Sequence, residues 1–349
     1  MAGMRIPSSM RRGALCLAAG TLGGALFALL GLPSPWMLGA LTASAAASIM
    51  GLDWALPAAA RNLARPVIGV LAGSAFTAEV ALGMLSLWQI LPVLMAFLLA
   101  TPFVGRVFFT RLCGFDRITA FFASTMGGLA ELTLLGGQHG GDMRRLVLVH
   151  AIRVISVVFL VPFAVRLLMD VNPNAVAPTV HHGSLTLKDW AILTACGALG
   201  YLIARQVRFP SAVMILPLMF SAACHIAGIT TAAPPGWLVA GVQVLIGSIV
   251  GARFAGIRLR EFQLTILQSL IWTALMLLAA MALAYACSRF LDVPLAALLL
   301  AFSPGGLAEM TTVAFAIGTD VAFVVTCHVL RVTFLVLAAP ALFRLGADK

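Results

Sequence analysis

Long apolar runs separated by short polar connectors make up almost the whole chain. A helix needs about 20 mostly apolar residues to cross the hydrocarbon core of a bilayer, and ten runs are of roughly that length. Two further apolar segments, 118–141 and 295–318, each carry a pair of glycines near the middle, which predicts an interrupted helix that either re-enters on one face or crosses the membrane. The ten uninterrupted runs predict membrane-spanning helices over 13–31, 35–52, 60–80, 87–110, 146–169, 190–207, 211–229, 237–253, 264–289 and 321–343.

The composition supports the same fold class. Of the 349 residues, 62% are hydrophobic and 10% are charged, whereas soluble domains are roughly 45–50% apolar and about 25% charged. We therefore expect an all-α polytopic transmembrane helical bundle without a soluble domain. Its expected parts are a cytoplasmic N-terminus at 1–12, a first membrane repeat at 13–169, an extracytoplasmic linker at 170–189 and a second membrane repeat at 190–345.

The two repeats are related by a duplication at a spacing of 178 residues. The block from Gly127 to Glu131, with the sequence GGLAE, recurs from Gly305 to Glu309. Shared apolar bias can align leucines by chance, but it does not align charged and polar residues in register. The polar residues that recur at this spacing are Thr133 and Thr311, Asp142 and Asp320, His150 and His328, and Arg153 and Arg331. Two glycines recur at the same spacing, Gly69 as Gly247 and Gly73 as Gly251.

The basic residues of equivalent loops alternate between the two repeats. The connector after the second span carries Arg61 and Arg65, while its counterpart at 230–236 carries no basic residue. Loops rich in lysine and arginine stay in the cytoplasm, so equivalent helices are expected to point in opposite directions. This predicts two inverted repeats of about five spans, each with one discontinuous or re-entrant segment, and places both termini in the cytoplasm.

The remaining composition excludes several classes of function. The net charge of +10 comes from residues scattered between apolar runs, which does not indicate a nucleic-acid-binding surface. The six cysteines lack the paired spacing of a zinc site or a disulfide framework. No metalloprotease, P-loop or nucleophile-elbow motif occurs. We therefore expect no enzyme activity, no metal, no cofactor and no nucleic-acid partner.

The glycine pairs are the first candidates for a binding site. Backbone groups freed at membrane depth are tolerated only where they are buried or line a cavity, and interrupted helices at matching positions of two repeats are typical of transporter sites. Close helix packing is the alternative explanation for such glycines. The candidate substrate- and ion-binding residues are Gly127, Gly128, Glu131, Thr133, His150, Arg153, Ser303, Gly305, Gly306, Glu309, Thr311, His328 and Arg331, with Asp142 and Asp320 as secondary candidates.

Ionisable groups at membrane depth are costly and indicate function. Glu131 and Glu309 are expected to bind a coupling cation, unless they serve only in structural ion pairs with Arg153 and Arg331. Each arginine could receive a substrate carboxylate or tie helices together. The histidine three residues before each arginine could relay a proton or be a satisfied buried polar group. The two secondary aspartates also fit helix caps or salt-bridge partners.

The duplicated block resembles the AbrB family of bacterial membrane proteins. The resemblance rests on 119–131, on Ser303-Pro-Gly-Gly-Leu-Ala-Glu-Met-Thr311, on Gly31-Leu-Pro-Ser-Pro-Trp36 and on Gly-Thr-Asp at 318–320, and it covers the chain from about Thr21 to Leu345. Met126 stands where the family pattern has proline. The family is named for a role in regulating gene expression and is sometimes labelled an ammonia monooxygenase. The resemblance implies a multi-pass protein of the bacterial inner (plasma) membrane.

The function that these features favour is an H⁺- or Na⁺-coupled secondary transporter of a small anionic solute, with an indirect effect on gene expression. The paired interruptions are similar to those of sodium- and proton-coupled carriers, which is an analogy of architecture. The main alternative is a membrane-embedded regulator acting through a cytoplasmic partner. An ammonia monooxygenase is a remote alternative, because it needs clustered metal ligands. The expected partners are the lipid bilayer, the solute and a coupling cation, and a homodimer is left open.

Overall fold

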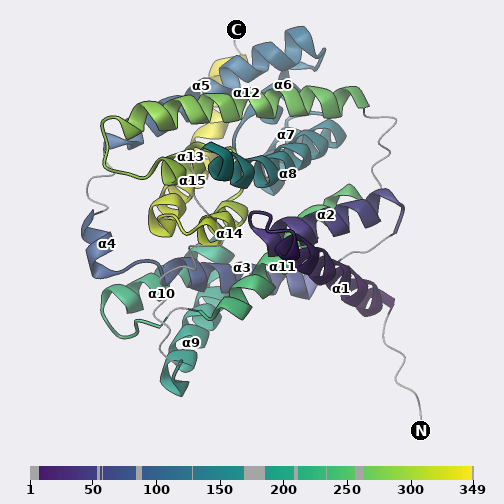
Figure 1. The fold of residues 1–349 in the computed structure, drawn as a ribbon. Helices are drawn as coiled ribbons and strands as arrows, with labels where there is room; N and C mark the ends of the chain where they lie inside the picture. The colour runs from purple at the N-terminus through teal and green to yellow at the C-terminus, as the bar shows by residue number, and fades with distance from the viewer. Residues whose placement is uncertain are drawn as a thin grey trace. The chain divides into compact units, whose positions relative to one another are not determined.

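The computed structural model describes residues 8–52, 56, 58–83, 89–127, 129–168, 185–207, 211–232, 234–255 and 263–347. All regular elements in this part of the chain are helices (Figure 1). The predicted all-α helical bundle is therefore confirmed. Of the expected extracytoplasmic linker at 170–189, only 185–189 belongs to the described residues.

A described helix lies at each of the ten predicted spans. The ends differ by a few residues from the sequence prediction, as helix ends usually do. The ten helices are α1 (Ser8–Leu29), α2 (Pro35–Ile49), α3 (Ala58–Gly73), α5 (Leu91–Val107), α8 (Met143–Leu168), α9 (Leu187–Ala204), α10 (Ala212–Ile226), α11 (Gly236–Gly251), α12 (Gln263–Ser288) and α15 (Val321–Ala347). Short α4 (Ala78–Gly83), the π-helical turn η2 (Phe108–Leu112) and the 3₁₀ turn η3 (Ala252–Phe254) lie between them.

Each glycine-interrupted segment forms two short helices with a non-helical break. The first contains α6 (Arg117–Ser124) and α7 (Leu129–Gln138), and the second contains α13 (Leu295–Phe302) and α14 (Leu307–Ile317). None of these four helices reaches the length of a membrane span. The two breaks lie between Ser124 and Leu129 and between Phe302 and Leu307, and each contains the pair of glycines seen in the sequence.

Five described helical segments are long and apolar enough to cross a membrane. They are Met10–Leu29, Leu91–Leu112, Met143–Leu167, Leu187–Ala204 and Gln263–Ser288. Shorter apolar helices, among them α10 and α11, accompany them. Such helices satisfy all interior backbone groups within the segment, as a bilayer requires. The chain is an integral membrane protein.

The chain divides into two compact units, and each unit combines segments from both halves of the sequence. Unit 1 comprises 1–78, 162–258 and 311–318, and unit 2 comprises 79–161, 259–310 and 319–349. The two units therefore do not coincide with the two sequence repeats. The repeats are established by the sequence alone. α14 contributes its first four residues to unit 2 and the rest to unit 1.

Small residues set the packing of unit 1. A Cβ at Gly73 of α3 would lie 2.5 Å from the backbone oxygen of Leu218 in α10, and a Cβ at Gly251 of α11 would lie 2.5 Å from the backbone oxygen of Leu41 in α2. Only glycine allows backbones to approach this closely. The two contacts join equivalent positions of the duplicated sequence. The inverted orientation of the copies stays a prediction.

Aromatic side chains of α5, η2, α12 and α13 pack against one another in unit 2. Trp272 of α12 is 2% exposed, and its ring lies 5.3 Å from that of Phe108 and 5.7 Å from that of Phe109. The rings of Phe97 in α5 and Phe302 in α13 meet edge to face at 6.1 Å. The contact of Phe302 packs the C-terminal end of α13 against α5, next to the break where the candidate site begins.

Candidate functional site

Arg153 of α8 binds the backbone at the first break. Its Nη1 donates to the carbonyl oxygen of Thr125 at 2.8 Å, and its Nη2 donates to the carbonyl oxygen of Gly127 at 2.9 Å. Because α6 ends at Ser124, both acceptors lie in the non-helical break that follows it, where carbonyl groups lack partners within a helix. Arg153, which is 2% exposed, supplies donors to them in the interior of the unit.

Arg331 of α15 makes the equivalent pair of bonds at the second break. Its Nη1 donates to the carbonyl oxygen of Ser303 at 2.6 Å, and its Nη2 donates to the carbonyl oxygen of Gly305. Ser303 is the C-cap residue that follows the last residue of α13, Phe302. Arg331 is also 2% exposed. The charge-assisted bonds stabilise each break, because a positive group at a helix C-terminus offsets the negative end of the helix dipole.

These bonds show that both arginines tie a continuous helix to a break, which is one of the two roles that the sequence allowed. A guanidinium has five N–H donors, and the bonds to the carbonyls use one on each terminal nitrogen. The Nε atoms of Arg153 and Arg331 are buried without a hydrogen-bond partner among the described residues. A buried unsatisfied donor requires an explanation, such as an ion or a ligand that binds there.

Glu309 lies in the first turn of α14 and is 8% exposed. Its carboxylate folds back over the Cα of Gly306, because a Cβ built at Gly306 would overlap the Oε2 atom. A carboxylate at this position is stabilised by the positive end of the helix dipole. Glu309 also interacts electrostatically with Arg153 and Arg331. The structure therefore brings these three charged candidates of unit 2 into one cluster.

The two candidate histidines differ in their contacts. His328, fully buried, donates from Nδ1 to the carbonyl oxygen of Val324 at 3.0 Å, which leaves Nε2 as an acceptor in the neutral ring. Nε2 has no hydrogen-bond partner among the described residues, and the same holds for both ring nitrogens of His150, which is also fully buried. Neither is therefore a fully satisfied buried polar group.

Of the remaining candidates near the two breaks, the structure describes the side chains of some but not of all. Thr133 on α7 is buried, and its hydroxyl has no hydrogen-bond partner in the described part of the chain. Thr311 on α14 is buried and belongs to unit 1. Gly128 and the side chain of Glu131 lie outside the described residues. Whether Glu131 joins the charged cluster therefore stays a prediction.

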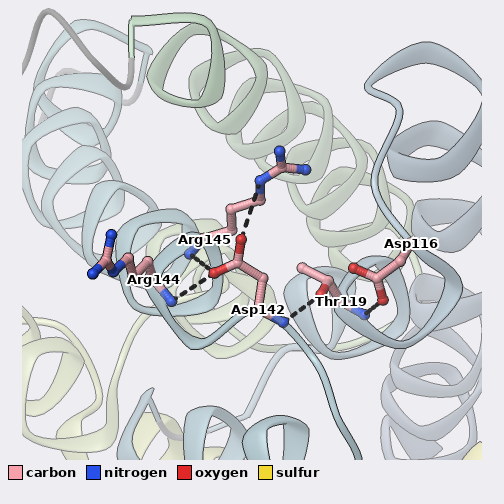
Figure 2. Close-up of polar contacts among 5 residues, drawn as sticks. All are labelled: Asp116, Thr119, Asp142, Arg144 and Arg145. Carbon is pink, nitrogen blue, oxygen red and sulfur yellow. Dashed lines mark hydrogen bonds and ion pairs between the residues drawn. The ribbon is translucent and has the colours of Figure 1, made fainter.

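The two secondary aspartates cap helices. Asp320 Oδ1 accepts from the backbone N–H of Phe323 at 3.0 Å, in the first turn of α15. Asp142 Oδ1 accepts from the backbone N–H groups of Arg144 and Arg145 at 2.9 and 3.2 Å, in the first turn of α8 (Figure 2). These are typical N-cap bonds. Both aspartates have the capping role that the sequence also allowed.

The two helices of the first interrupted segment form a hairpin. The N–H of Asp142, which follows α7, donates to Thr119 Oγ1 at 2.7 Å in the first turn of α6 (Figure 2). Farther into the hairpin, a Cβ at Gly136 of α7 would lie 3.2 Å from Phe122 of α6. The two short helices are therefore antiparallel neighbours, and the segment enters and leaves at the same end of unit 2.

Sequence reasoning missed the residues that close this hairpin. Asp116 Oδ1 accepts from the backbone N–H of Thr119 at 2.8 Å and caps α6, while the Thr119 side chain binds Asp142. Arg145 Nε lies 3.4 Å from Asp142 Oδ2, and its guanidinium stacks on the Phe115 ring at 4.9 Å. Asp116 before an apolar helix was a detectable capping signal, whereas the pairing with Asp142 depends on the fold.

Among the described residues, no three His, Cys, Asp or Glu side chains group as metal ligands. The chemistry of the described part of the site is that of charge and hydrogen bonding. It consists of two guanidinium groups, one buried carboxylate in the described set and two buried imidazoles. Such groups can bind an ion or move a proton.

Comparisons with known proteins agree with the resemblance seen in the sequence. The family model described as "Transition state regulatory protein AbrB" matches residues 36–347. The "Putative regulator AbrB" of Escherichia coli (strain K12) is 26% identical over 325 residues, covering 90% of each chain. The "Uncharacterized protein YhjN" of Bacillus subtilis (strain 168) is 24% identical over 356 residues, covering 94% of this chain and 91% of the relative. No solved structure matches significantly. The chain belongs to the AbrB family.

Proposed function

We propose that the protein is a secondary transporter of a small anionic solute, coupled to H⁺ or Na⁺, and not an enzyme. The observation that carries the proposal is Glu309, a carboxylate 8% exposed at the break between α13 and α14. Ionisable groups inside a membrane protein are retained for ion or substrate pathways, and discontinuous helices position such groups in transporters.

The roles of the charged cluster follow from its chemistry. Glu309 binds or releases the coupling cation, since it is the buried acid of the described cluster. Arg153 and Arg331 hold the breaks together and attract the anion through the donors that the carbonyls do not use. His150 and His328 are candidates for proton relay between this cluster and water.

The location and orientation belong to the same proposal. We place the protein in the bacterial inner membrane, with both termini in the cytoplasm, because basic loops favour the cytoplasmic side. In this orientation Arg144 and Arg145 lie on the cytoplasmic side. The hairpin of α6 and α7 then enters from the cytoplasm. Fusion of alkaline phosphatase or a fluorescent protein to each terminus tests this topology.

A current measurement on a supported membrane tests the transport proposal. Proteoliposomes are exposed to a panel of inorganic anions and mono-, di- and tricarboxylates, with and without Na⁺ and at several pH values. We expect at least one anion to produce a current that depends on the cation gradient. Glu309→Gln should lower that current at least tenfold, while Arg144→Gln, on an exposed side chain, should leave it unchanged. An equal current in the Glu309→Gln protein would contradict the coupling role.

A regulator is the second candidate, because the relative in Escherichia coli carries the name "Putative regulator AbrB". The two functions separate in a genetic test. The gene for this protein is deleted, and the Glu309→Gln protein is then produced in the deletion strain. If regulation follows from transport of an effector, this variant should fail to restore the expression of the genes that the deletion affects. Full restoration by this variant favours a regulator that acts through a protein partner.

A further inference from the structure

Unit 1 contains an apolar groove of about 760 Å³ that is lined by residues of α3, α9 and α11. This volume is within the range of about 300–1,000 Å³ found for small-molecule sites. Its walls include Val67 and Val70 of α3 and Leu193 and Ala198 of α9. None of the side chains that line it is charged. The groove is chemically unlike the charged cluster of unit 2 and requires an apolar occupant.

The groove runs along α9. Trp190 lines it near the start of the helix and Tyr201 lines it near the end. Eleven residues of α-helix separate them, which corresponds to about 16 Å at 1.5 Å per residue. One leaflet of a bilayer has a hydrocarbon depth of about 15 Å, half of the full core. The length of the groove therefore matches one extended acyl chain.

The groove is open on one side. Leu63 of α3 and Leu238 of α11 line it, and the former is 65% exposed. In a membrane-spanning unit, an open apolar surface of this kind faces acyl chains, not water. At the Trp190 end the indole ring lies 6.3 Å from that of Trp237. Tryptophan pairs at helix ends are typical of the membrane interface.

The two ends of the groove differ in charge. Arg205 lies four residues after Tyr201, so it extends the groove-lining face of α9 by one turn, and it is exposed. At the other end Lys188 and Asp189 carry opposite charges, and Asp189 accepts a hydrogen bond from Thr230 at 2.8 Å. A negative headgroup is therefore favoured at the Arg205 end.

We propose that this groove binds one acyl chain of an anionic phospholipid, with the headgroup phosphate at Arg205. The acyl chain fills the apolar volume from Tyr201 toward Trp190, and the guanidinium of Arg205 binds the phosphate. The site does not use the residues of unit 2 to which we assign transport. It makes the stability of unit 1 dependent on the lipid composition of the membrane.

Substitutions in neighbouring positions of α9 test the acyl-chain site. Ala198→Trp fills the groove, whereas Leu199→Trp places the same side chain one residue away, at a position that is 51% exposed and does not line the groove. The full-length protein is purified in detergent, stripped of lipid and titrated with dioleoyl-phosphatidylglycerol. Binding is followed by native mass spectrometry and by the rise in melting temperature.

The expected outcome is a saturable complex with phosphatidylglycerol in the wild-type and Leu199→Trp proteins. Ala198→Trp should lower the apparent affinity at least tenfold and abolish the rise in melting temperature. The fold of this variant is checked by its circular dichroism and by monodisperse gel filtration. If a correctly folded Ala198→Trp protein binds phosphatidylglycerol as tightly as the wild type, the groove is not the lipid site.

A second arm tests the headgroup. Arg205→Gln should weaken phosphatidylglycerol binding about fivefold, since a basic residue near the surface contributes about 1 kcal/mol to binding of anionic lipid. It should leave the weaker binding of dioleoyl-phosphatidylcholine unchanged. An equal loss for both lipids would contradict the assigned headgroup position. A different result would show that a second copy of the chain occupies the groove. In that case the lipid-free wild-type protein would be a dimer, and the lipid-free Ala198→Trp protein would be a monomer.

Discussion

Nη1 of Arg331 donates a hydrogen bond to the backbone carbonyl oxygen of Ser303 at 2.6 Å. The two residues are 28 positions apart, and the same separation joins Arg153 to Thr125 in the first half of the chain. In both places a guanidinium on a long helix replaces the N–H groups that an unbroken helix would supply. The polar residues that recur in the sequence therefore have a shared structural task at the two breaks.

Replacement of Arg331 by lysine should destabilise the protein. Lysine has a single ammonium group, which cannot bind two carbonyl oxygens in the fork geometry of a guanidinium. The loss of one charge-assisted hydrogen bond should lower the free energy of unfolding by about 2 kcal/mol. Thermal unfolding in detergent measures the change. The matched control is Arg144→Lys on an exposed side chain, which should change stability by less than about 0.5 kcal/mol; equal melting temperatures for both variants would refute the prediction.

Gly306→Ala should separate transport from stability. The new methyl group takes the space of Oε2 of Glu309, so the flexible carboxylate has to move away from the start of α14. We expect the anion-dependent current to fall about tenfold while the free energy of unfolding changes by less than about 1 kcal/mol. Gly241→Ala on α11 is the control, because a Cβ there meets no atom within 4 Å. Retention of the full current by Gly306→Ala would show that the position of the carboxylate is unimportant.

Gly73→Ala and Gly251→Ala should lower the stability of the folded protein by equal amounts. Each Cβ would lie 2.5 Å from a backbone oxygen, at Leu218 and Leu41 respectively, and a backbone cannot move as a side-chain tip does. Overpacking of this kind costs about 1–3 kcal/mol. Melting temperatures measured beside the Gly241→Ala protein test the prediction. A large loss at one glycine and none at the other would show that the two contacts are not energetically equivalent.

Oxidation should link Cys196 to Cys224. Their Sγ atoms are 3.7 Å apart on the neighbouring helices α9 and α10, and a modest shift brings them to the about 2.05 Å of a disulfide. Copper-phenanthroline with oxygen removes one hydrogen from each thiol, and peptide mass spectrometry after trypsin detects the linked pair. Cys224→Ser should abolish the link. If only intermolecular disulfides form in the wild type, the packing of α9 on α10 is wrong.

Local patterns in the sequence predicted the helices well. An apolar run of about 20 residues predicts a spanning helix whatever its neighbours are, and the paired glycines mark the breaks before α7 and α14. The capping alternative for Asp142 and Asp320 was also visible, because a cap acts within one turn of its own helix.

The long-range contacts could not be predicted in the same way. Arg153 and Arg331 were recognised as buried charges, but the sequence left open whether they bind a solute, an acid or the backbone. The hairpin closed by Thr119 and Asp142 was one of two open alternatives until the fold placed the two residues 2.7 Å apart. The apolar groove lined by Trp190 and Tyr201 left no sequence signal, since its walls come from three separate helices.

The sequence by itself determined that this is a helical membrane protein of the AbrB family, with a duplicated glycine motif and paired charged residues within or next to its apolar segments. These properties follow from the composition, the length of the apolar runs and the internal similarity of the chain. Each of these can be read along the sequence without knowing which distant residues are in contact. Only the tertiary structure decided that two compact units each draw on both halves of the chain, and that the arginines bind the carbonyl groups of the breaks. Those facts depend on contacts between distant residues, because a buried donor is satisfied by whichever acceptor the packing brings to it.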